Sequence, residues 1–414
     1  MKLSMEKDSK ISKWTTLGVS LIACYIMFRY MLGSSELYFL SGIFLVLMRG
    51  KKLRMCLDVS DYFWIVYVLI VFFFGIIRDD IGITIKRTIL FYVIIFSKIL
   101  LQTDHNRWSK PFFDLLVALG LIHAVSIVIE VINPSFIRAV KNILKVSDRE
   151  HRAAYLNGIT TQPAIVAFGI SVFTCVCAIC VLRSEKTRVK YLFLSLLGVS
   201  TLLLTGKRTL FIVVVFCCFV LIYLYYAVIM KKFFQLFTII LSVLMLLPFV
   251  MRLSVFSRNI DRLLYGDDAG RFLIWQVLID NFKSSPLIGV GRNAYYSQMD
   301  IGAHDDYLRV LSENGLLGFT FFFLALMIPL VKTLGCIISN RDAIKSIVFS
   351  DDKYIVLELL ASILGQLLIL LYALTGNPLN SPEQLLSYMA FTSLGLSAKS
   401  RLEQAKNGDQ VDNP

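Results

Sequence analysis

The run LFIVVVFCCFVLIYLYYAVIM, Leu210–Met230, decides the fold class, because it carries no charged residue over the length of a membrane crossing. An α-helix rises about 1.5 Å per residue, so about 20 apolar residues cover the roughly 30 Å of hydrocarbon in a bilayer. Similar runs recur along the chain, of which 57% is hydrophobic and 17% is charged. A soluble chain of 414 residues could not bury that much apolar surface. The sequence therefore predicts an all-α, polytopic membrane protein.

These runs predict twelve transmembrane helices. The first run has no small-residue cleavage site and another span follows it at once, so we interpret it as a retained helix and not as a signal peptide. The second and seventh runs are short enough to be tilted or re-entrant. The predicted spans are 14–32, 35–49, 62–77, 84–101, 112–132, 161–182, 191–204, 209–230, 233–251, 315–334, 354–374 and 383–398.

The lysines and arginines of the short loops predict the orientation. They gather before the first span, after the second, between the sixth and seventh, between the eighth and ninth, and after the twelfth. With twelve spans these segments share one side, which the positive-inside rule assigns to the cytoplasm together with both termini. The turn Gly33-Ser34 and the segment Thr375–Pro382 carry no cation and fall outside. The formal charge of +13 suits membrane lipids with anionic headgroups, and nothing indicates nucleic acid.

Three segments predicted to lie outside are nonetheless basic: Asn133–Thr160, the turn Thr205–Arg208 and the long loop 252–315. One interpretation is that these cations are only tolerated, since long loops follow the positive-inside rule weakly and an arginine can snorkel to the interface. The other is an anion site at the outer surface of the membrane. The turn favours an anion site, because a very short loop should obey the rule and yet contains Lys207 and Arg208.

Neither metal nor cofactor binding is indicated. Of eight cysteines, Cys175, Cys177 and Cys180 come closest to the spacing of metal ligands, but they lie in an apolar run. We interpret them as small packing residues. Adjacent aspartates such as Asp267-Asp268, Asp305-Asp306 and Asp351-Asp352 could bind a divalent ion, but neighbouring side chains on a helix do not converge on one ion. We therefore expect no metal and no cofactor.

His304 is the histidine best placed for chemistry. If the segment from Ala303 is helical, His304 shares a face with Tyr307 and lies near the boundary between water and bilayer. Partial desolvation would keep the imidazole neutral and available as a base near pH 7, whereas Asp305 or Asp306 would favour the imidazolium. The alternative is a structural or solvated histidine.

Arg271 begins a predicted short amphipathic helix of the long loop, which Pro286 ends. Asp267 and Asp268 offer N-cap oxygens for this helix. A cation in the first turn opposes the helix dipole unless an anion lies nearby. That anion is either one of the two aspartates or a ligand phosphate, held by backbone N–H groups and a forked guanidinium.

Four stretches together resemble the O-antigen ligase and polysaccharide polymerase family of bacterial inner-membrane enzymes. AHDDYLRVLSENGLLG at 303–318 is similar to the family's His-Asn-x-x-Leu…Glu-x-Gly-x-x-Gly block, and PLIGVGRNAYY precedes it at 286–296. GRFLIWQ at 270–276 and TGKRTLF at 205–211 fall where the family places its arginines. The resemblance is specific over 270–320 and weaker at 205–210, and elsewhere it extends only to hydropathy and span count. Asp305 stands where asparagine is usual, which keeps an acceptor oxygen, loses an amide donor and adds a charge.

The resemblance implies a metal-independent glycosyltransferase that uses an undecaprenyl-diphosphate-linked glycan on the periplasmic side of the inner membrane. It implies that His304 is the general base that removes a proton from an acceptor sugar hydroxyl. Arg208 and Arg271, with Arg292 as a weaker candidate, would bind the diphosphate and stabilise it as the leaving group. The residues expected to support them are Lys207, Asp305, Tyr307 and Glu313.

The chain then divides into four predicted segments. Residues 1–251 form a transmembrane bundle of about nine spans, and 252–314 form a periplasmic catalytic loop with short helices. Residues 315–398 form a bundle of about three spans, and 399–414 a cytoplasmic tail.

Three functions are open. We favour a polymerase that joins O-antigen or capsule repeat units, over a ligase that transfers the glycan to lipid A-core, because PLIGVGRNAYY…AHDDYLRVL reads more like repeat-unit polymerases. A chain-length regulator and a flippase are expected partner proteins. A transporter or flippase for the same lipid-linked glycan is the alternative of another class. It would be expected to carry ionisable residues deep in its spans and a half-repeat, for which His123 with Glu130 and Glu358 with Gln366 are the few candidates.

Overall fold

The computed structural model describes residues 13–32, 35–49, 56–103, 108–146, 156–239, 241, 270–292, 294, 302–348 and 353–411. Within these ranges every regular element is a helix, which confirms the predicted all-α class. The π-helical segment η3 continues α9 without a break. The helices are α1 Lys13–Phe28, η1 Arg29–Met31, α2 Glu36–Arg49, α3 Val59–Arg78, α4 Ile81–Gln102, α5 Ser109–Ile132, α6 Pro134–Ile143, α7 Pro163–Cys180, α8 Glu185–Leu204, α9 Arg208–Tyr223, η3 Leu224–Ile229, α12 Arg271–Ser284, α14 Asp306–Ser339, α15 Arg341–Ile347, α16 Lys353–Tyr372 and α17 Pro382–Val411.

Seven of the described helices are long and apolar enough to cross a membrane: α3, α5, α7, α8, α9 with η3, α14 and α16. Helices α1, α2, α4 and α17 cover four further predicted spans. The ninth predicted span, 233–251, lies largely outside the described residues, so the total of twelve stays a prediction.

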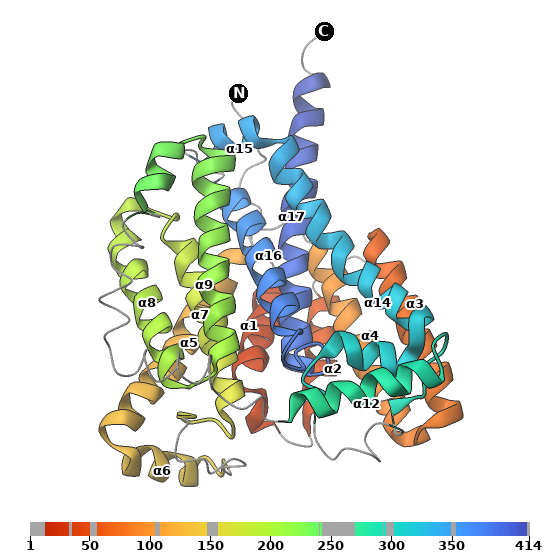
Figure 1. The fold of residues 1–414 in the computed structure, drawn as a ribbon. Coiled ribbons are helices and arrows are strands. Elements are labelled where there is room, and N and C mark those ends of the chain that lie inside the picture. Colours follow the sequence, from red (N-terminus) through yellow and green to blue (C-terminus); the bar gives the residue numbers. More distant parts are fainter. Residues whose placement is uncertain are drawn as a thin grey trace.

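The bundle has two distinct ends (Figure 1). One end, which we call the α12 end, carries α6 and α12. The other end, the α15 end, carries α15 and the C-terminal part of α17. The turn between α3 and α4 and the segment between α16 and α17 both bond to residues around α12 and the start of α14, so they belong to the α12 end. These segments were all expected on one side of the membrane.

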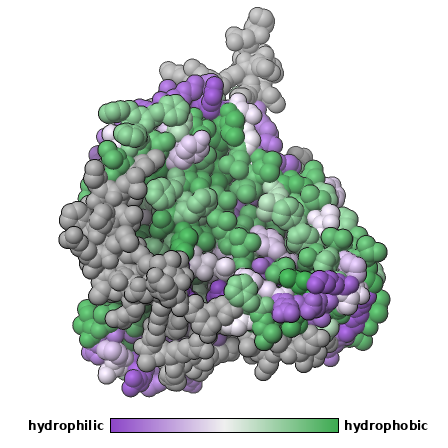
Figure 2. Space-filling view, in the orientation of Figure 1, coloured by the Kyte–Doolittle hydropathy of each residue, from purple (hydrophilic) through white to green (hydrophobic). Residues whose placement is uncertain are grey.

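The core of the bundle is formed by α7 and α16, which are buried along most of their length and pack against α9 and α17. The outer helices instead expose large apolar side chains, among them Phe193, Phe216 and Val331. Figure 2 shows apolar residues across the middle of the visible face, with hydrophilic residues at its top and over the α12 region. This distribution is what a helix bundle surrounded by lipid requires.

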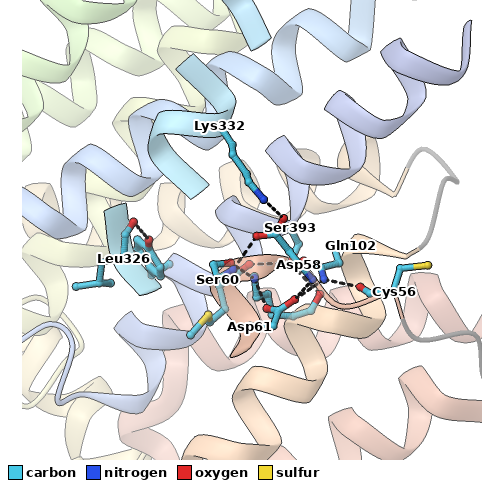
Figure 3. A network of polar contacts seen from close by, with 11 residues as sticks. Cys56, Asp58, Ser60, Asp61, Gln102, Leu326, Lys332 and Ser393 are labelled. Atoms are coloured by element: carbon cyan, nitrogen blue, oxygen red, sulfur yellow. Dashed lines mark hydrogen bonds and ion pairs between the residues drawn. The ribbon is translucent and has the colours of Figure 1, made fainter. Parts of the chain in front are cut away.

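A buried polar cluster closes the α15 end of α3, α4 and α14 (Figure 3). Asp58 and Asp61 form a capping box at the start of α3. Lys98 of α4 pairs with the buried Asp61, which also accepts a hydrogen bond of 2.7 Å from Gln102. Lys332 of α14 lies 2.5 Å from Asp58. Charges at membrane depth are costly unless they are paired, so this cluster fixes three helices against one another.

Candidate active site at the α12 end

Helix α12 carries Arg271 as its first residue. The predicted N-caps, Asp267 and Asp268, lie outside the described residues, and Gly270 caps the helix in a left-handed conformation, with φ 74° and no capping side chain. The expected aspartate cap therefore stays a prediction, whereas the predicted end before Pro286 is confirmed. No acidic side chain lies in the first turn of α12.

The buried face of α12 packs on the start of α14. Ile274 and Leu278 are buried against Ala303, and Trp275 and Leu308 pack on the same cluster. Figure 1 shows α12 lying across the beginning of α14. This apolar contact holds the segment that carries His304 beside the helix that carries Arg271.

The stretch Pro286–Arg292 forms a clamp on a kink in α14. Gly315 interrupts that helix with φ 62° and ψ −168°. Across the kink, Val290 N–H donates to Ser312 O at 3.0 Å and Leu316 N–H donates to Pro286 O at 2.8 Å. Any Cβ on Gly315 would lie 2.4 Å from the backbone of the clamp, so this position requires glycine. The glycines of PLIGVGRN at 286–293 and of SENGLLG at 312–318 thus lie at one joint between α12 and α14.

His304 lies immediately before α14 and not within it. Asp305 is the N-cap and accepts a hydrogen bond of 2.9 Å from Leu308 N–H, and the helix begins at Asp306. The predicted helix from Ala303 was therefore wrong, because the aspartate cap fixes a later start. His304 is half-buried and has φ 54°, in the left-handed region. A non-glycine residue in that region is uncommon and is often found at functional sites.

The first turns of α14, which follow His304 in the chain, contain a buried ion cluster. Arg309, 1% exposed, bonds to Asp306 at 2.8 Å and to Glu313 at 2.9 Å. Arg87 of α4 lies 3.7 Å from the same Glu313 carboxylate and donates to Asn380 at 3.1 Å. Buried charges persist only when they are paired, so this cluster rigidly joins α4, α14 and the start of α17.

The segment that joins α16 to α17 is fixed to the start of α14 from both sides. Asp306 N–H donates to Ala373 O at 2.9 Å, and the Asp306 carboxylate accepts from Leu379 N–H at 2.6 Å. The Tyr307 hydroxyl donates to Leu370 O at 3.0 Å. Asp306 and Tyr307 therefore serve to hold the 373–379 segment beside His304.

Arg271 lies within electrostatic range of Tyr372, the last residue of α16. Asp306 and Glu383 lie within the same range of Tyr372. No hydrogen bond or ion pair joins the Arg271 guanidinium to any residue that the structure describes. Arg271 is half-buried, so it is a partly desolvated cation without a carboxylate partner in the described chain.

Arg208 is the first residue of α9 and lies at the same height in the bundle as Ala373, at the end of α16. Helices α9 and α16 are antiparallel neighbours, with Cys217 Sγ 3.8 Å from Leu364 O, and η3 contacts α15 at their other end. Arg208 is nine residues before Cys217 and Ala373 is nine residues after Leu364, so the two lie at one height in the bundle. Within the described ranges the half-buried Arg208 side chain makes no ion pair. Lys207 is the N-cap residue of α9, with no capping side-chain bond.

Arg292 belongs to the clamp. Its backbone N–H donates to the Asp79 carboxylate at 3.3 Å, and its charge acts on Arg87. Arg78 donates to the carbonyls of Ile288 and Gly289, which binds the clamp to the turn between α3 and α4. Arg292 thus lies on the α4 side of the α14 start, whereas Arg271 lies on the α16 side.

Burial raises the pKa of the Asp305 carboxyl, while the N–H groups of Leu308 and Tyr307 oppose the shift. A capping oxygen needs only to accept a hydrogen bond, which asparagine and aspartate do equally well. Aspartate at this position therefore preserves the helix start and changes only the charge beside His304.

Sequence reasoning missed Arg87 and Arg309. Arg309 could have been found, since Asp306 and Glu313 flank it at the helical spacings of three and four residues. Arg87 lies near the start of a predicted span, where a charge indicates a specific partner. Its bond to Asn380 joins positions 293 apart, which no local pattern reveals.

Among the described residues, no group of three His, Cys, Asp or Glu side chains is placed to hold a metal ion. The carboxylates of Asp305 and Asp306 are used as a helix cap and as an ion-pair partner. Cys175, Cys177 and Cys180 are free thiols in the buried helix α7.

Comparison with known proteins gives one family. The model of a family described as O-Antigen ligase matches residues 193–323, which run from α8 through α9 and α12 into α14. The matched region contains Arg208, Arg271, Arg292, His304 and Glu313. A search of curated proteins finds no similar sequence. Over residues 193–323, this multi-pass protein is similar to the O-antigen ligase and polymerase family, whose members are glycosyltransferase-like enzymes.

Proposed function

We propose that this protein transfers an undecaprenyl-diphosphate-linked glycan to an acceptor sugar hydroxyl at the α12 end of the bundle, and that it polymerises O-antigen or capsule repeat units. In this proposal the α12 end faces the periplasm and the α15 end faces the cytoplasm of the inner membrane. The donor, the acceptor glycan and membrane lipids are the partners of the site, and chain-length regulator and flippase proteins act beside it.

The observation that carries the proposal is the contrast between two groups of arginines. Arg309 and Arg87 are occupied by carboxylates and hold helices together. Arg208 and Arg271 are half-buried at the level of His304, and the described chain gives neither of them an ion-pair partner. A partly desolvated guanidinium without a carboxylate is well suited to bind an anionic ligand bidentately.

The reaction would use each group in turn. His304 accepts the proton of the acceptor hydroxyl, whose oxygen forms a bond to the anomeric carbon of the donor sugar. The bond from that carbon to the diphosphate breaks, and its electron pair leaves with the lipid diphosphate. Arg208 and Arg271, assisted by Arg292, stabilise the charge that develops there, because fixed cations act most strongly where little water is present. The proton on His304 is then released to solvent.

The remaining residues would position these groups. Asp305 caps the helix that follows His304. The ion pairs of Glu313 and the hydrogen bond of Tyr307 hold α14 against α4 and α16. Lys207 adds a second cation beside Arg208 at the start of α9. The apolar outer faces of the bundle suit the polyprenyl tail of the donor.

Deletion of the gene, followed by gel analysis of the surface glycan, tests the proposal. Loss of polymerisation leaves a single repeat unit on the lipid core, as we expect. Bare core with accumulated lipid-linked polymer would instead identify a ligase. Accumulation of unflipped repeats inside the cell would identify a transporter and overturn the proposed reaction.

A further inference from the structure

We propose that Thr375 and Asn377, in the segment between α16 and α17, form a site for the hydroxyl groups of a sugar and orient that sugar toward His304. This inference rests on the proposed function and adds residues outside the region that matches the family, which ends at residue 323. The site is the segment 373–379, which contains the sequence Thr375-Gly376-Asn377.

The segment is held in place before any ligand arrives. One backbone bond joins Ala373 to Asp306 at one side, and a second joins Leu379 to the Asp306 carboxylate at the other. Thr375 and Asn377 lie between these two fixed points. Their side chains are therefore positioned by the same residue, Asp306, that begins the helix after His304.

Both side chains keep an oxygen that is buried and unbonded. Thr375 Oγ1 and Asn377 Oδ1 are shielded from solvent, and neither has a hydrogen-bond partner among the residues that the structure describes. Buried polar atoms almost always have a partner, so two unbonded oxygens only two residues apart point to a ligand. The ordinary structural bonds of this turn are made by its backbone, through Asn377 O and the Asn380 N–H at 3.3 Å.

The amide of Asn377 lies against the approach to His304. A Cβ built on Gly302 would be 2.8 Å from Asn377 Nδ2. Gly302 is two residues before His304, so their Cα atoms are at most about 7 Å apart. The Asn377 amide therefore occupies space that a side chain at position 302 would take.

The chemistry of the two groups selects the ligand. A hydroxyl and a carboxamide are neutral and can both donate and accept, which matches a sugar hydroxyl. A diphosphate would instead require cations, and those lie on α9 and α12. The sugar comes either from the acceptor, whose hydroxyl His304 would deprotonate, or from the donor beside its anomeric carbon.

The test uses the purified full-length protein in lipid nanodiscs. The probe is the lipid-linked repeat unit, extracted from cells that lack the gene. Two rates are measured: transfer to an acceptor glycan, and slow hydrolysis of the same donor by water. The variants are Thr375→Val and Asn377→Ala. Thr320→Val is the matched control, because the Thr320 hydroxyl lies on the exposed side of α14 and bonds only to Leu316 O of its own helix.

We expect transfer to fall roughly 3- to 10-fold in each variant, as for the loss of one hydrogen bond between neutral groups, with the melting temperature of the wild type retained. If hydrolysis is unchanged, the site holds the acceptor sugar; if hydrolysis falls equally, it holds the donor sugar. Transfer at the rate of the Thr320→Val control in both variants would overturn the inference while leaving the proposed function standing. A wild-type protein that neither transfers nor hydrolyses the donor would instead overturn the proposed function, and the inference with it.

The variant Gly302→Ala is a second, independent test of the role of the Asn377 amide. The added methyl group displaces the Asn377 amide, so this variant should lose as much transfer as Asn377→Ala. The double variant Gly302→Ala/Asn377→Ala should transfer at the same rate as Asn377→Ala alone, because the amide that the methyl group would displace is already absent. Independent losses that multiply in the double variant would contradict a shared site.

Discussion

Replacement of His304 separates its backbone role from its chemical role. The residue has φ 54°, a conformation that costs a residue with a side chain about 1–2 kcal/mol and costs glycine very little. Glycine also loses about 0.5–1 kcal/mol more conformational freedom on folding. These two terms partly cancel, so we expect His304→Gly to change the stability of the folded protein by no more than about 1.5 kcal/mol. Asparagine also tolerates a positive φ, so His304→Asn should change the stability by a similarly small amount.

The chemical role predicts a much larger effect on activity. A histidine base contributes about 10²- to 10⁴-fold to the rate of proton transfer, so His304→Gly and His304→Asn should both lose at least about 100-fold in transfer. The assay measures transfer of lipid-linked repeats by the purified variants, with apparent melting temperature as the control for folding. Added imidazole should restore part of the activity of His304→Gly, because a base can occupy the space left by the ring. Either variant with transfer within about tenfold of the wild type would remove His304 from the mechanism.

Three further predictions concern Arg271, the helix cap Asp305 and the buried Lys98–Asp61 ion pair. Arg271→Lys should reduce transfer by roughly 10-fold or more, because lysine cannot make a forked phosphate contact, and full activity would contradict the diphosphate role. Asp305→Asn should keep the helix cap and the transfer activity, and it should move the acidic limb of the activity profile to lower pH, because a carboxylate that favours the imidazolium of His304 is gone. An unmoved limb would contradict this coupling. Lys98→Met should lower the free energy of unfolding by about 3–5 kcal/mol, because it leaves the buried Asp61 without its cation, and Asp61→Asn added to it should recover most of the loss in a thermal melt.

The helices could be predicted from the sequence because lipid imposes a simple rule on them. A run such as Leu210–Met230 has to cross the bilayer as a helix, since no other backbone arrangement satisfies its polar groups there. The start of α14 was harder, because His304, Asp305 and Asp306 all precede an apolar stretch and two of them can cap a helix. The structure assigns the cap to Asp305, and that choice places His304 outside the helix in a left-handed conformation.

The rest of the site depends on contacts between distant parts of the chain. Asp306 bonds to Leu379, 73 positions away, and Arg87 bonds to Asn380, 293 positions away. Hydropathy predicts that these segments are near the same membrane surface, but it does not say which of them touch. The sequence therefore predicted His304 and the external arginines as candidates, whereas the segment 373–380 that packs beside them could be seen only in the structure.

The pairing of charges divides the arginines of the α12 end into two groups. Arg309, 1% exposed, lies between two carboxylates, and removal of either carboxylate would leave a buried charge unpaired. Such an arginine cannot exchange its partners for a ligand without a large loss of stability. Arg208 and Arg271 are half-buried, and the described residues provide neither with a carboxylate. We therefore propose that one group of arginines fixes the site and that the other group binds the ligand. If this division is right, Arg309→Lys should mainly lower stability, whereas Arg271→Lys should lower transfer at unchanged melting temperature.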